Sequence, residues 1–152
     1  CGRLGVEGSD LKVEVAGSSD VRISSISAAE LIISAAGSCD INLGEVNASS
    51  FESVIAGSGN IDAAHVNADS ADLTIAGSGD MDMYLNVNEL NASIAGSGAL
   101  ALKGAVSRRA KYSIAGSGHI NAKDLKCPAT SYETKGGSIT YQDADGHLVK
   151  ED

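Results

Sequence analysis

The stretch LTIAGSGDMDMYL, residues 73–85, contains the small-residue word AGSG, flanked on both sides by alternating apolar and polar residues. The word recurs along the chain as AGSS, AGSC or AGSG, and a last, degenerate copy reads KGGS. The first glycines of the copies are Gly17, Gly37, Gly57, Gly77, Gly96, Gly116 and Gly136. Successive copies are therefore 20 residues apart, except for one interval of 19 between Gly77 and Gly96. A repeat of this length is typical of solenoid proteins.

The residues around each word follow a period of two. Leu73 and Ile75 occupy alternate positions before the word, and the alternation resumes after it at Met81 and Met83. This period indicates β-strands with one buried face, and it excludes a helical repeat. A unit of 20 residues can bury its apolar face only against its neighbours. We therefore predict a β-solenoid of about seven 20-residue rungs, in which each strand pairs in parallel with the same positions of the adjacent rungs.

We interpret the small-residue word as a corner of the coil. If the alternation continues through it, both glycines point inward, where a side chain would prevent a tight bend, and the alanine and serine face solvent. The shortened interval coincides with YLNVNEL, in which Val87 stands one position outside the apolar column. The sequence therefore predicts a locally altered loop at residues 84–88.

The repeat also predicts the organisation of the chain. We expect a single domain, with a partial first rung at residues 1–9, the repeats at 10–141 and a charged cap or tail at 142–152. Read backwards, the register assigns Val6 to an apolar column and Cys1 to an inward position. This favours a core cysteine cut from a longer parent over the lipidated start of a lipoprotein, which remains an alternative. An open first rung would also be a pairing surface for a homo-oligomer.

Composition excludes several classes of partner. The 152 residues carry a net charge of −9, and nucleic acids and anionic membranes are bound through clustered Lys and Arg, so neither is expected here. Cys1, Cys39 and Cys127 are odd in number and widely spaced, which argues against a disulfide framework and a zinc site. No cofactor is expected.

The outward columns predict a candidate ligand face. Its serine, amide, carboxylate and aromatic side chains are Ser58, Asn60, Asp62, Ser78, Asp80, Asp82 and Tyr84. A rigid polar face of this kind suits a glycan or another surface polymer, and Tyr84 is the one obvious aromatic platform for a sugar. The alternative is a solvated face whose serines only hydrogen-bond along the stack.

The acidic residues also suggest two other kinds of site, a calcium site and a catalytic site. GSGDMDM is similar to the nonapeptide repeats that bind calcium, but those have a period of nine and a different aspartate position. Carboxylates stacked on neighbouring rungs leave a calcium site open as an alternative. A polysaccharide-active enzyme would need acids near a base, and Arg22 lies two rungs from Asp62. We therefore predict neither catalytic residues nor metal ligands, with an enzyme and a purely structural spacer as the alternative functions.

The words AGSGNI, AGSGDM and AGSGHI, followed by polar residues such as Asp62 and Asn121, resemble the head GIN domain of auto-transporter adhesins. That family occurs largely in Bacteroidetes-type bacteria, and the resemblance extends from about Asp10 to Tyr141. It implies a right-handed parallel β-helix related in shape to pectin-lyase-like proteins. It also implies a secreted or cell-envelope location, on the outer surface or in the periplasm, and an adhesive role without catalytic residues.

The chain departs from the family's word at four positions. Ser19 and Cys39 replace the second glycine, and Ala99 and Ala101 replace the outward polar pair. These changes interrupt the uniform face and argue against a strictly periodic ligand.

Overall fold

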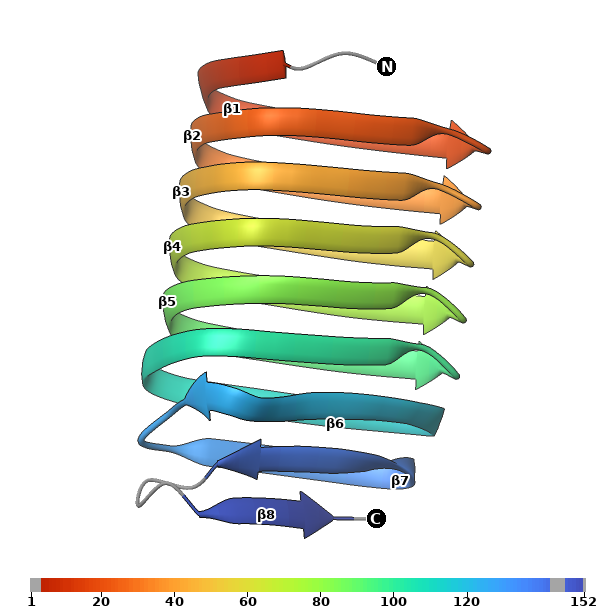
Figure 1. Cartoon of the computed structure of the whole chain (residues 1–152), viewed down its shortest axis with the longest axis vertical. Coiled ribbons are helices and arrows are strands. Elements are labelled where there is room, and N and C mark those ends of the chain that lie inside the picture. Colours follow the sequence, from red (N-terminus) through yellow and green to blue (C-terminus); the bar gives the residue numbers. More distant parts are fainter. Residues whose placement is uncertain (1–3, 143–146, 152) are drawn as a thin grey trace.

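The computed structural model describes residues 4–142 and 147–151, whose strands form one continuous stack (Figure 1). The strands are β1 Leu4–Gly17, β2 Asp20–Gly37, β3 Asp40–Gly57, β4 Asn60–Gly77, β5 Asp80–Gly96, β6 Ala99–Lys126, β7 Thr130–Gln142 and β8 Leu148–Glu151. They form a single sheet in sequence order, parallel from β1 to β7, and β8 pairs antiparallel with β7. The predicted β-solenoid is confirmed.

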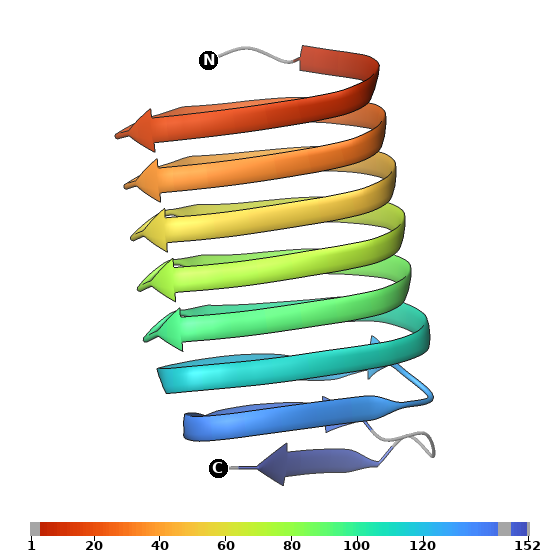
Figure 2. The same ribbon diagram turned by 180° about the vertical axis from the view of Figure 1, so that it is seen from behind.

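Each of β2 to β5 follows one complete turn of the coil. The chain runs along a front strand, through a wide bend, back along a back strand and into a tight corner made by the glycine word (Figure 1). Figure 2 shows the back strands ending at these glycine corners. The two opposite views show a right-handed coil, as the resemblance implies. Pairing follows the repeat, so that Ile41 lies beside Ile61 and Ile61 beside Met81.

The core consists of columns of inward side chains. Ile55, Ile75, Ile94 and Ile114 are successive register partners, and all are buried. Two other columns alternate large and small residues. Their pairs on successive back strands are Phe51 with Ser53, Ala71 with Leu73, Leu90 with Ala92, and Ala110 with Tyr112. Each of these four turns thus combines one large side chain with one small one, which fills the interior evenly although the chain has few aromatic residues.

The glycine corners differ in part from the sequence prediction. The second glycine, such as Gly59, is buried as expected. The first does not face the core: Gly57 is only half-buried, and its φ of 131° lies in a region that side chains rarely adopt. A Cβ atom built on Gly57 would lie 2.5 Å from the carbonyl oxygen of Gly37 in the previous turn. Backbone conformation and the close approach of successive turns therefore require this glycine.

The local alteration predicted at residues 84–88 is present, but it lies within a strand and is not a loop. β5 is continuous from Asp80 to Gly96, and its pairing with β4 slips by one residue between Ala63 and Val66. A second irregularity, between Val87 and Glu89, restores the 20-residue spacing in β6. Because Tyr84 alone takes the place of the pair at 64–65, the next residues return to alternation, and Val87 is buried rather than displaced.

The structure describes only part of the predicted first rung and of the predicted C-terminal tail. Val6 pairs with Ile26, which agrees with the register assigned to the first rung. Cys1 lies outside the described residues, as do residues 143–146 and 152 of the predicted tail. In the part that is described, no helix has the length and apolar character needed to cross a membrane.

Because Tyr112 is buried, we expect the folded protein to lose stability at alkaline pH. Its side chain is buried in β6, and burial, followed by the neighbouring Cys127, raises the pKa of the phenol well above its usual value of 10.0. The folded protein therefore holds this proton more tightly than the unfolded chain. The stabilisation is fully present below pH 10 and is lost as the pH rises above that value.

Tyr112→Phe should reduce the fall in the free energy of unfolding between about pH 9 and about pH 11, as measured by urea denaturation. Tyr132→Phe is the matched control, because Tyr132 is 40% exposed. Identical pH dependence in the two variants would contradict the assignment to Tyr112.

Candidate ligand-binding face

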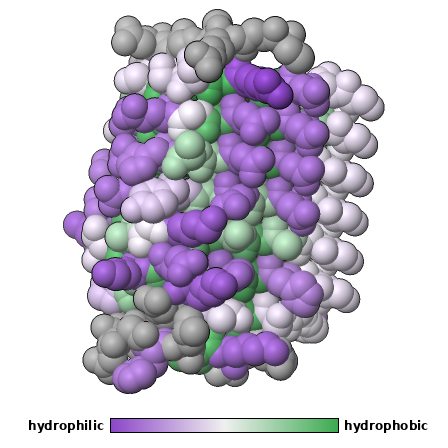
Figure 3. Space-filling model, viewed as in Figure 1, coloured by the Kyte–Doolittle hydropathy of each residue, from purple (hydrophilic) through white to green (hydrophobic). Residues whose placement is uncertain are grey.

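The outward side chains of the front strands form two polar columns, which we call the front face. Asn42, Asp62 and Asp82 are successive register partners, and all three are exposed. The neighbouring column contains Asp40, Asn60 and Asp80. Figure 3 shows these columns as hydrophilic stripes beside a paler ridge at the glycine corners. In-register stacking thus converts a sequence repeat into rows of carboxylate and amide groups a few ångströms apart.

Amide groups relieve repulsion within the second column. Asn60 donates a hydrogen bond from Nδ2 to Oδ1 of Asp40 at 3.0 Å. The backbone N–H of Ala99 donates to Oδ1 of Asp80 at 3.1 Å. The carboxylates of Asp40 and Asp80 are therefore partly satisfied by the protein itself, and Asn60 stands between them in the column.

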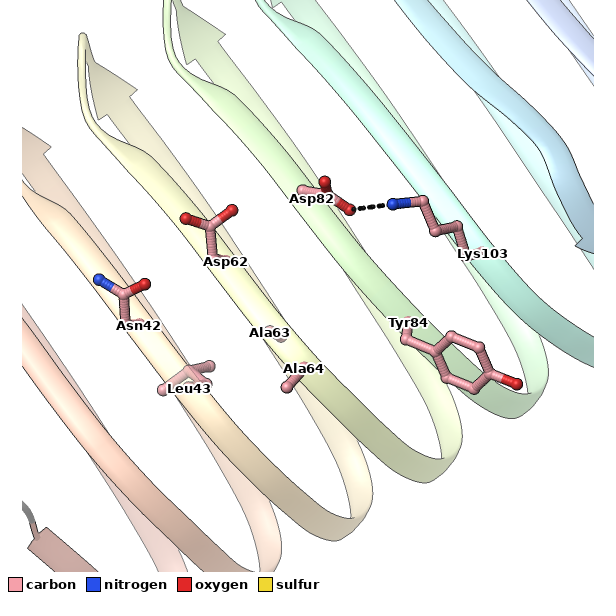
Figure 4. A pocket seen from close by; sticks show the side chains of 8 residues that line it. All are labelled: Asn42, Leu43, Asp62, Ala63, Ala64, Asp82, Tyr84 and Lys103. Carbon is pink, nitrogen blue, oxygen red and sulfur yellow. Dashed lines mark hydrogen bonds and ion pairs between the residues drawn. The ribbon is translucent and has the colours of Figure 1, made fainter.

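A groove of about 410 Å³ crosses the first column near the wide bend (Figure 4). It is lined by Asn42, Leu43, Asp62, Ala63, Ala64, Asp82, Tyr84 and Lys103. A second groove, of about 520 Å³, extends towards the glycine corners and the C-terminal turns, with Asn60, Asp80, His119 and Asn121 among its lining residues. Asp62 and Asp82 line both grooves and are therefore the central acids of the face.

Tyr84 is the aromatic side chain of the first groove. Its ring stacks on that of His65, with 5.0 Å between the ring centroids and 17° between the planes. Tyr84 nevertheless remains 44% exposed, which is unusual for a large apolar side chain in this protein. The stacking fixes the ring while leaving part of it accessible to a ligand.

The two central carboxylates differ in their surroundings. Lys103 reaches back from β6 and forms an ion pair with Asp82, with 3.4 Å between Nζ and Oδ1 (Figure 4). The carboxylate of Asp62 forms no ion pair and accepts no hydrogen bond within residues 4–142 and 147–151. The groove therefore offers one free acceptor, one acceptor shared with a cation, and an ammonium group.

The residues predicted for the ligand face do not all lie in the same groove. Asp62, Asp82 and Tyr84 line the first groove, and Asn60 and Asp80 line only the second. Ser58 and Ser78 are exposed at the glycine corners and line neither groove. In both serines the backbone N–H donates across the stack, to the carbonyls of Gly37 and Gly57 respectively.

Sequence reasoning missed three participants. Asn42 belongs to the same column as Asp62, so the repeat alone could have identified it. Lys103 pairs with Tyr84 across the strands, which follows from the 19-residue interval once the slip is placed correctly. His65 carried no comparable signal, because its contact with Tyr84 depends on that slip.

The face consists of groups that bind ligands through hydrogen bonds and aromatic contact. Carboxylate side chains accept hydrogen bonds from hydroxyl groups, amide side chains both accept and donate them, and Tyr84 supplies an apolar surface. Among the described residues, no group of three or more His, Cys, Asp or Glu side chains is placed to hold a metal ion.

A family model described as "putative auto-transporter adhesin, head GIN domain" matches the chain over residues 3–104 and again over residues 64–148. The chain belongs to this family. The overlap of the two matches is consistent with a repeat that aligns in more than one register. Comparison of this head GIN domain with curated proteins and with solved structures gave no match.

The matched residues contain both grooves of the front face. The family description is that of an adhesin-like domain at a cell surface. In this head GIN domain, the polar grooves lie on the outer wall of the coil, and the interior is filled by side chains.

Proposed function

We propose that this head GIN domain is a non-catalytic binding module, exported to the bacterial cell surface or envelope, that recognises a glycan through its front face. The observation that carries the proposal is the exposed, fixed ring of Tyr84 in a groove with the carboxylates of Asp62 and Asp82. Membership of an adhesin family supports the surface role. No catalytic residue is required for it.

The groove matches the chemistry of a sugar. The face of an aromatic ring carries partial negative charge and attracts the polarised C–H groups of a pyranose. Asp62 and Asp82 would accept hydrogen bonds from the sugar hydroxyls, and the Asn42 amide can both donate and accept. A few polar groups of this kind fix the orientation of a ligand in its site.

Tyr84→Ala should lower the affinity for the glycan about tenfold, because the aromatic contact contributes roughly 1 kcal/mol or more. The measurement screens plant, mucin and bacterial polysaccharides and records retained protein and released sugar together. Tyr132→Ala is the matched control, since Tyr132 is the other exposed large apolar residue among those whose burial the structure describes, and it lines neither groove.

The same screen separates the alternative functions. Retention of the domain without released sugar, weakened in Tyr84→Ala alone, would support the proposal. Released oligosaccharide would indicate a polysaccharide-active enzyme. An absence of both signals would favour a structural spacer, and an equal effect of the two tyrosine variants would remove Tyr84 from the site.

A further inference from the structure

Charge is distributed unevenly along the stack. Residues 9–98 contain 13 Asp and Glu residues but only two Lys and Arg, whereas residues 99–126 contain six Lys and Arg and one Asp. We call these six side chains the basic collar: Lys103, Arg108, Arg109, Lys111, Lys123 and Lys126. All six are exposed, and all belong to β6. The net charge of the whole chain conceals this local excess of positive charge.

The collar extends around the outside of two successive turns. Lys103 and Lys123 each follow the first glycine of a corner by seven residues, so they occupy equivalent positions one turn apart. Residues 107–109 are all exposed, which breaks the alternation and marks the wide bend. Lys111 lies beyond the bend on the back strand. The positive groups therefore follow a convex path from front to back, roughly 10 Å high along the axis.

Most of the collar is not neutralised by the protein. Two members reach back to β5: Lys103 to Asp82, and Arg109 to Glu89 at 3.7 Å. The other four form no ion pair within the described part of the chain. Cations concentrated in this way raise the local positive potential, which attracts an anionic ligand.

A groove on the back strands begins at the collar. Lys111 lines it together with three half-buried hydroxyl groups from Thr74, Ser93 and Ser113, which are register partners on successive turns. Its volume is about 300 Å³. Two further lining residues, Asn91 and Asp72, are joined by a hydrogen bond of 2.9 Å from Nδ2 to Oδ1. A cation beside a row of hydroxyls is suited to a ligand that carries both negative charge and hydroxyl groups.

We propose that the basic collar and this back groove bind a flexible linear polysaccharide bearing carboxylate or sulfate groups, at a site that meets the first groove of the front face only at Lys103. A flexible chain can follow the convex path, whereas a second rigid solenoid would touch it only along a line. A bilayer or a nucleic acid duplex would overlap the acidic turns next to the collar and be repelled. Single-stranded nucleic acid usually needs exposed aromatic platforms, and residues 99–126 expose no Phe, Tyr or Trp.

The test compares two charge-matched double variants by calorimetric titration. Lys111→Gln with Lys126→Gln removes two collar cations that form no ion pair with any residue the structure describes. Lys12→Gln with Arg22→Gln removes the same charge from the first turns. The probes are polygalacturonate for carboxylate, dextran sulfate for sulfate and dextran as the neutral polymer. We expect the collar variant to bind a charged polymer at least about tenfold more weakly, and the control to bind within about twofold of wild type.

Binding of either charged polymer, but not of dextran, supports the proposal and identifies the recognised group. Failure of the wild-type domain to bind both charged polymers would overturn it, as would equal weakening in both double variants. Tighter binding of a single-stranded oligonucleotide or of anionic vesicles would reassign the collar to another partner. Self-association that the collar variant abolishes, seen by sedimentation at low salt without polymer binding, would identify a second copy as the partner.

One more variant separates this site from the front face. Tyr84→Ala should keep full affinity for the charged polymer, because Tyr84 is absent from the back groove. Loss of that affinity would contradict the existence of two separate sites. The two proposals can also fail separately. If the domain binds the charged polymer but Tyr84→Ala changes the binding of no glycan, the collar site stands and only the proposed role of the front face is refuted.

Discussion

Gly57→Ala is expected to lower the free energy of unfolding by about 3 kcal/mol or more, because two costs coincide at this corner. Its φ of 131° is unfavourable for any residue with a Cβ atom. The added methyl group would also lie 2.5 Å from the carbonyl oxygen of Gly37 and 2.9 Å from its nitrogen. Backbone atoms cannot give way as the end of a side chain can, so the two turns would have to separate.

Gly17→Ala is the matched control for this substitution. Gly17 has a φ of 90°, but a Cβ built on it would meet nothing within 4 Å. Its cost should therefore be conformational strain alone, of the order of 1–2 kcal/mol. Urea denaturation of the two variants measures the difference between their losses in the free energy of unfolding. That difference is the cost of the contact between successive turns. Equal losses would show that strain, rather than the approach of successive turns, requires glycine at these corners.

Phe51→Ala is expected to cost about 3–5 kcal/mol, the range for a fully buried phenylalanine. The side chain has no exposed surface, and it is the only phenylalanine in the chain. Its partner in the next turn is Ala71, which is too small to fill the resulting space. A cavity at this point would also remove contacts from Leu31, the partner in the preceding turn.

A second substitution tests whether volume is the cause. Ser53 lies beside Phe51 in the same turn, is fully buried, and has a hydroxyl without a hydrogen-bond partner. Phe51→Ala with Ser53→Leu reproduces the pair Ala71 and Leu73 of the next turn. The double variant should regain roughly half of the lost stability in urea denaturation. If it is no more stable than Phe51→Ala, the shape of the phenyl ring matters rather than the filled volume.

The regular part of the fold could be predicted from the sequence because its pattern repeats. Alternation at Leu73 and Ile75 indicated strands, and the constant spacing of the glycine words gave the parallel register. The irregular turn was misread, since Val87 was placed by counting from the previous turn. The slip at residues 64–65 returns it to the core, and a period alone does not show where a strand absorbs a missing residue.

The candidate sites were predicted less completely. Asp62 and Asp82 followed from the outward columns, because position in the repeat determines exposure. The stacking of Tyr84 on His65 depends on side-chain conformations across the slip. The basic collar was missed because the argument from net charge averaged over the chain. Counting Lys and Arg along the chain, instead of over the whole chain, would have revealed the cluster that includes Lys111 and Lys126.

The slip in β5 also determines how many equivalent positions the front face offers. A polymer on a perfectly periodic wall could shift by one turn and find the same contacts, so it would bind in several degenerate registers. In β5, which is one residue shorter at this point, the outward position is occupied by the aromatic ring of Tyr84. The corresponding position holds Ala64 in the turn before and Lys103 in the turn after. Translational symmetry is broken there, and a chain lying along the wall has one preferred starting point.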